Sequence, residues 1–152
     1  MTWNEINNKK DIDVFMETFG GFHDSCLKEL HMSTDSFVGD ELGMAVPLGL
    51  DTKVRILFQK QSRNPSAIEL YFEEVTEMHI HPRGENQDSI IYDATLIQRD
   101  GLFYWADEYG WDPDNYTVGR NSWIAAKKVK WRDVSSWMGQ TNRYGVISED
   151  ET

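Results

Sequence analysis

The sequence predicts an α+β fold, in which one N-terminal amphipathic helix packs on a curved, mainly antiparallel sheet of six to seven strands. Near the start of the chain, apolar residues recur at the helical spacing i, i+3, i+4 and i+7, at Ile12, Phe15, Met16 and Phe19. Farther along, apolar and polar residues alternate, as they do in half-buried strands. The dipeptide Asp100-Gly101 between two such segments is typical of a hairpin turn.

The helix is predicted over residues 9–19, with Asn8 as its N-cap and Gly20 able to take the left-handed conformation that ends a helix. Seven segments are then predicted as strands, in chain order 26–32, 42–48, 53–60, 67–80, 90–96, 102–106 and 122–131. Pro47 favours an edge position for the second of them, because proline cannot donate to a strand ladder.

A chain of 152 residues is long enough to bury one core, so residues 1–147 are predicted as a single α+β domain. Residues 148–152 are predicted as an acidic C-terminal tail. Cys26 is the only cysteine, so no intramolecular disulfide can form. The first residues lack the pattern of a secretory signal, and no apolar stretch has transmembrane length, which predicts a cytoplasmic location and no membrane partner.

The charge balance predicts a basic protein as the preferred kind of partner. The chain has 26 acidic and 15 basic residues, for a net charge of −11. Such a domain repels phosphate backbones, so nucleic-acid binding is not expected, whereas complementary charge speeds encounter with a basic protein. The alternative is that the acidity only keeps the protein soluble. One basic cluster, predicted to pair with nearby acids, consists of Lys127, Lys128, Lys130 and Arg132.

The segment between the helix and the first strand contains Gly20, Gly21, His23, Asp24, Ser25 and Cys26. These residue types occur in hydrolase sites, but a catalytic triad needs side chains that converge from separate parts of a fold. In an extended segment, His23 and Ser25 lie on one side and Asp24 lies on the other. We therefore predict no catalytic residue here, and a structural joint in which Gly20 and Gly21 turn the chain and His23, Asp24 and Ser25 secure its entry into the sheet.

A second candidate is His79, His81 and Glu85, whose spacing resembles half of the first metal motif of cupins, which are metal-binding barrels. Two histidines at i and i+2 on one strand face can both reach a metal. Glu73 and Tyr92 stand where that motif has glycines, and no histidine follows His81 as a further ligand. We expect no cofactor, and we keep a small metal-binding barrel or metal-dependent enzyme as the alternative.

The third candidate is the connection 107–121, which combines acids with aromatic residues. It lacks the ligand spacing of an EF-hand. Tyrosine and tryptophan anchor many interfaces, so the predicted partner-binding residues are Asp107, Tyr109, Trp111, Asp112 and Tyr116. The alternative is that these aromatic side chains fold back on the core.

Residues 19–25, with the sequence FGGFHDS, and residues 124–131, with the sequence IAAKKVKW, together resemble a group of small uncharacterised bacterial proteins. Some members are similar to immunity proteins of polymorphic toxin systems, which are small acidic antagonists that sequester a cognate toxin. The resemblance implies a binding role and transfers no catalytic residue. The predicted function is therefore a non-enzymatic, immunity-like protein-binding domain that binds or neutralises a basic partner such as a toxin.

Overall fold

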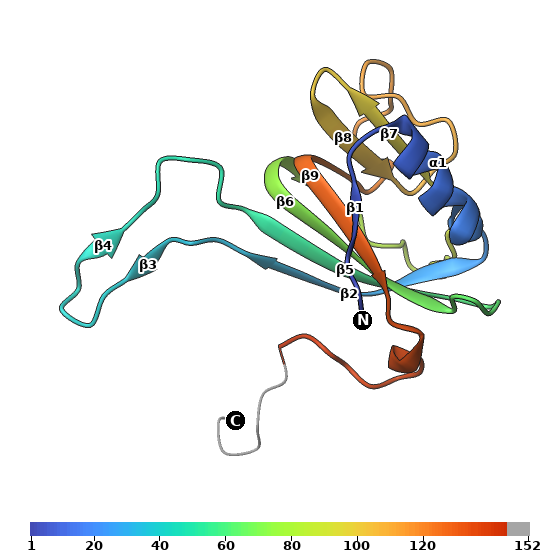
Figure 1. Cartoon of the computed structure of the whole chain (residues 1–152), viewed down its shortest axis with the longest axis horizontal. Coiled ribbons are helices and arrows are strands. Elements are labelled where there is room, and N and C mark those ends of the chain that lie inside the picture. The colour runs from blue at the N-terminus through green and yellow to red at the C-terminus, as the bar shows by residue number, and fades with distance from the viewer. Residues whose placement is uncertain (146–152) are drawn as a thin grey trace.

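The computed structural model describes residues 1–145, which form an α+β fold with one α-helix and a mainly antiparallel seven-stranded sheet (Figure 1). The strand order is β2-β5-β6-β9-β8-β7, and β1 also pairs with β9. The elements of the main body are β1 (Asn4–Ile6), α1 (Lys9–Thr18), the 3₁₀ turn η1 (Gly20–Phe22), β2 (Ser25–Ser33), β5 (Lys53–Lys60), β6 (Ala67–His79), β7 (Thr95–Arg99), β8 (Leu102–Ala106), β9 (Trp123–Asp133) and the 3₁₀ turn η2 (Ser135–Trp137). The predicted tail 148–152 and its boundary lie outside the described residues.

The helix lies where the spacing predicts it, but it is not the first element of the chain. Asn8 caps α1, because its side-chain oxygen accepts a hydrogen bond from the Asp11 backbone N–H at 2.9 Å. Ile12 and Phe15 are buried against the sheet. The strand β1 precedes the helix and pairs with β9. β1 is not among the predicted strands, because three residues with one buried side chain are too short to show a period.

Most predicted strands are present, and two are corrected. β5 and β8 have the predicted bounds, while β2, β6 and β9 differ from the prediction only at their ends. The segment predicted at 42–48 contains only β4 (Met44–Ala45), which pairs with β3 (Phe37–Val38) in a separate two-stranded sheet. The strand predicted at 90–96 begins only at Thr95. Before it, a single antiparallel bridge joins Ile91 to Ser25.

Strand β9 is the organising strand of the sheet. One of its edges pairs with β6 along most of its length. Its other edge is shared, because residues 123–126 pair with β8 and residues 129–131 pair with β1. The sheet is not strongly curled, which corrects the prediction of a curved sheet.

An aromatic cluster fills the space between α1 and the sheet. Phe22 lies at its centre, with ring centroids 4.9 Å from both Phe19 and Phe58 and 5.8 Å from Trp105. Phe22 has a φ of +67°, which is unfavourable for a bulky residue. Its ring is fully buried, and burial of a phenylalanine stabilises by about 1.5–3 kcal/mol, enough to offset that cost.

The opposite face of the sheet contains a buried ionic network around Glu69. Its carboxylate is fully buried and accepts hydrogen bonds from Arg132 at 2.7 Å and from the Tyr144 hydroxyl at 2.5 Å. Elsewhere in the predicted basic cluster, the Nζ atoms of Lys128 and Lys130 each lie 3.4 Å from a β6 glutamate. The predicted pairing with nearby acids is therefore present for Lys128, Lys130 and Arg132, whereas Lys127 forms no ion pair within residues 1–145.

Candidate functional site

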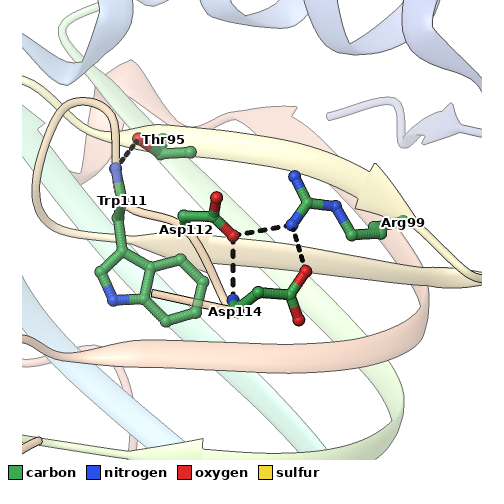
Figure 2. Close-up of polar contacts among 5 residues, drawn as sticks. All are labelled: Thr95, Arg99, Trp111, Asp112 and Asp114. Atoms are coloured by element: carbon green, nitrogen blue, oxygen red, sulfur yellow. Dashed lines mark hydrogen bonds and ion pairs between the residues drawn. The ribbon is translucent and has the colours of Figure 1, made fainter. Parts of the chain in front are cut away.

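The connection 107–121 is fixed to β7 by hydrogen bonds (Figure 2). The Thr95 hydroxyl donates to the Glu108 carbonyl at 2.7 Å and accepts from the Trp111 backbone N–H at 3.3 Å. Arg99 Nη1 donates to Asp112 Oδ1 at 2.7 Å and to Asp114 Oδ2 at 2.9 Å. The Asp114 backbone N–H and then Arg99 lower the pKa of Asp112, because both stabilise its charged form.

Of the three aromatic residues predicted as contacts, only Tyr109 is exposed, at 81%. Trp111 is 5% exposed and packs on Trp123, with ring centroids 5.0 Å apart. Tyr116 is half-buried and lies 5.2 Å from Trp111. The alternative, in which the aromatic side chains fold back on the core, therefore holds for Trp111. Its ring packs beneath the connection and stabilises it.

The acids of this connection have partners within the chain. Asp107 Oδ1 accepts hydrogen bonds from Asn121 Nδ2 at 3.1 Å and from the Ser122 backbone N–H at 3.2 Å. Burial nevertheless raises the pKa of Asp107, because it disfavours the carboxylate. Glu108 pairs with Arg120 at 3.1 Å. Since internal bases and N–H groups already compensate these acids, the loop offers a basic partner less free negative charge than its composition suggests.

The predicted joint connects η1 to the segment before β7. Gly20 and Gly21 both have positive φ, and the Gly21 carbonyl accepts from the Ala94 N–H at 2.9 Å. The Ser25 hydroxyl is buried and donates to the Phe22 carbonyl at 2.7 Å. These contacts support a structural role for the segment.

The predicted alternation of side chains within the joint is wrong. Asp24 has a φ of +56°, so the backbone is not extended there. The Asp24 carboxylate consequently lies 3.3 Å from His23 Nε2 instead of on the opposite side. His23 Nδ1 donates to the Tyr92 carbonyl at 2.8 Å, and this hydrogen bond, followed by the charge of Asp24, raises the pKa of His23.

The residues of the metal-binding alternative have other contacts. The His79 ring stacks on Trp123, with centroids 4.5 Å apart, and His79 Nε2 lies 3.3 Å from Glu77. The His81 backbone N–H donates to the Ser122 hydroxyl at 2.8 Å, and Glu85 is exposed. Within residues 1–145, no three His, Cys, Asp or Glu side chains come together as a metal-ligand group. No observation here favours the metal alternative.

Among residues 1–145, the most exposed apolar feature is the hairpin extension formed by residues 34–52, which the sequence pattern did not predict. We call this extension the arm. It continues the β2–β5 pair beyond Ser33 and Lys53 and projects away from the rest of the sheet (Figure 1). The large apolar side chains that it exposes are Phe37, Val38, Leu42, Met44, Val46, Leu48 and Leu50. Large apolar side chains exposed together on one element are typical of interaction sites in soluble proteins.

The arm has a defined backbone. At its base, the Asp35 N–H donates to Asp51 Oδ2 at 2.9 Å, and Lys53 Nζ lies 2.9 Å from Asp35 Oδ1. At its tip, the Gly39 N–H donates to the Gly43 carbonyl at 2.8 Å. The apolar side chains are therefore presented on a hydrogen-bonded hairpin.

The arm is also acidic. Its charged residues are Asp35, Asp40, Glu41 and Asp51, and it contains no lysine, arginine or histidine. Among the described residues, Asp40 and Glu41 at the tip form no ion pair with a base, whereas Asp35 pairs with Lys53. Apolar side chains and uncompensated acids thus occur together at the tip.

No family model matches this chain, and no curated protein or solved structure matches it either. Across residues 1–145, no helix has both the length and the apolar character that crossing a membrane requires.

Proposed function

We propose that this chain is a non-enzymatic protein-binding domain, and that the arm inserts into an apolar groove with basic residues at its rim on a partner protein. The observation that carries the proposal is the set of exposed apolar side chains on the projecting hairpin. In this role the protein is an immunity-like antagonist, as its sequence resemblance implies, and the partner is a basic protein such as a toxin.

Burial of apolar side chains supplies the affinity in this proposal. Leu42 is 85% exposed and Leu48 is fully exposed. Burying one such side chain stabilises a complex by about 1.5–3 kcal/mol. A few anchors of this kind dominate the binding energy of typical interfaces. The arm therefore carries enough unburied apolar surface to form the centre of an interface.

Charge selects the kind of partner. Asp40 and Glu41 flank the apolar residues at the tip, and the whole chain carries a net charge of −11. Two arms facing each other would bring like charges together, which disfavours a second copy as the partner. Anionic lipid is disfavoured for the same reason. A basic protein combines attraction at long range with an apolar groove at short range.

The test begins with capture of proteins from the source cells on immobilised wild-type chain, followed by production of any captured basic protein in pure form. Capture alone does not count as support. Binding of the two purified proteins is then measured by calorimetry. We expect Leu42→Asp to weaken binding by at least about 30-fold, since hot-spot positions contribute about 2 kcal/mol or more.

Val118→Asp is the matched control, because Val118 is 84% exposed and lies outside the arm, in the connection 107–121. Both variants add one negative charge to an exposed apolar position, so a general charge effect weakens binding equally in both. We also expect affinity to fall as salt concentration rises. Equal loss in the two variants, binding that does not respond to salt, or a wild-type dimer that Leu42→Asp dissociates would each contradict the proposal.

A further inference from the structure

The outer face of the sheet contains a cavity whose charge is opposite to that of the whole protein. It has a volume of about 310 Å³, at the lower end of the range for small-molecule pockets. β2, β5 and β6 form its floor, and residues 143–145 close one side. Its lining contains no aspartate or glutamate, and its basic members are His31, Lys53, Arg55 and Arg143.

Within residues 1–145, two of these cations, Arg55 and Arg143, form no side-chain hydrogen bond with a carboxylate. Arg55 Nη1 lies 4.0 Å from Glu69 Oε2, which is too long for a hydrogen bond. Glu69 is already compensated by Arg132 and by the Tyr144 hydroxyl. Arg143 forms no ion pair with any acid in residues 1–145. Lys53 differs, because it pairs with Asp35 at 2.9 Å.

The surroundings of the cavity hold the Arg55 guanidinium and the backbone at Arg143 in place. The Arg55 guanidinium lies over the Tyr71 ring, 4.6 Å from its centroid, which fixes the plane of its donors. Tyr144 is held by its hydrogen bond to Glu69, and Glu29 Oε2 accepts from the Arg143 backbone N–H at 2.7 Å. A preorganised arginine loses little freedom when it binds an anion, so it binds more tightly than a mobile one.

We propose that this cavity binds a phosphate group. Arginine presents paired N–H donors that match the oxygen atoms of phosphate, and Arg55 and Arg143 supply two such groups in one cavity. The net charge of −11 does not prevent this, because salt screens charges beyond about 8 Å at physiological ionic strength and the cavity lining is basic. Tyr144 lies in the same lining and provides an aromatic wall for an organic group attached to the phosphate.

Calorimetric titration of the full chain with inorganic phosphate, and separately with phenyl phosphate, tests the proposal. The background is sodium chloride at constant ionic strength. We expect saturable binding, and a weakening of about tenfold or more in both Arg55→Gln and Arg143→Gln, because a hydrogen bond to a charged group contributes about 1.5–3 kcal/mol. Tighter binding of phenyl phosphate identifies a phosphorylated aromatic molecule as the ligand class. Tighter binding of inorganic phosphate identifies free phosphate.

Lys127→Gln is the matched control, because Lys127 is exposed and lies outside the cavity lining. Its affinity for phosphate should equal that of the wild type. Arg143 is exposed, so Arg143→Gln keeps the test valid even if Arg55→Gln does not fold. Absence of saturable binding to either ligand overturns the proposal. Equal weakening by Lys127→Gln and Arg143→Gln, which indicates only general charge attraction, also overturns it.

Discussion

The buried Glu69–Arg132 pair gives the sharpest prediction about stability. Arg132→Met keeps an apolar side chain near Trp3 and Trp137 but leaves the Glu69 carboxylate, which is 0% exposed, without its 2.7 Å partner. Removal of one member of a buried ion pair costs about 3–5 kcal/mol. At about 2–4 °C per kcal/mol for a domain of this size, the Tm falls by roughly 6–20 °C.

The assay is urea unfolding followed by tryptophan fluorescence, with the slope of the transition checked for constancy. The double variant Glu69→Gln/Arg132→Met removes the unpaired charge while keeping an oxygen that accepts from the Tyr144 hydroxyl, so we expect it to be more stable than Arg132→Met alone. The reasoning is refuted if Arg132→Met costs less than about 1 kcal/mol, which is the value of an exposed pair. It is also refuted if the double variant is no more stable than the single one.

Two further predictions concern the connection 107–121. Trp111→Ala should lower the free energy of unfolding by about 3–5 kcal/mol because it empties a buried site, whereas Tyr109→Ala should change it by less than about 0.5 kcal/mol, and equal effects in urea unfolding would contradict the burial difference. The pKa of Asp107 is raised in the folded state, so from pH 3.8 up to that raised pKa the folded protein binds more protons than the unfolded one. The contribution of Asp107 to stability therefore falls as pH rises through this window. Asp107→Asn keeps the Oδ1 acceptor, so its stability relative to the wild type should rise over that pH window in urea titrations, and a constant difference across pH would argue against the raised pKa.

Periodicity in the sequence predicts the elements that bury one continuous face. The burial of a side chain in such an element depends only on which side of the element meets the core, and local spacing encodes that side. Ile12 and Phe15 in α1 and the alternating residues of β5 are buried in this way. β1 was not predictable in this way. Its place is set by the free edge of β9 at residues 129–131. These residues lie more than 120 positions farther along the sequence, so the pairing leaves no local signal.

The candidate site was harder to predict because exposure depends on what packs nearby. Trp111 is buried only because the connection folds back over Trp123, and no local pattern shows that contact. In the arm, Gly39, Gly43 and Pro47 interrupt any regular period, so its apolar residues resemble an ordinary edge strand. A useful signal was the occurrence of seven large apolar residues within residues 37–50 without one basic residue.

The shared edges of β9 also determine when the protein can fold during synthesis. Among the described segments, only residues 123–133 pair with all three of β1, β8 and the outer edge of β6. The ribosome makes this segment after β1, β6 and β8, so β1 stays without its partner while more than a hundred residues are translated, and the outer edge of β6 stays unpaired while residues 80–122 are translated. The three strands β2, β5 and β6 can pair before β9 is made. The sheet is completed only when β9 has left the ribosomal exit tunnel. The sheet is therefore completed only after residues 123–133 have been synthesised, and the long sequence separation of the β1–β9 pairing makes that last step slow.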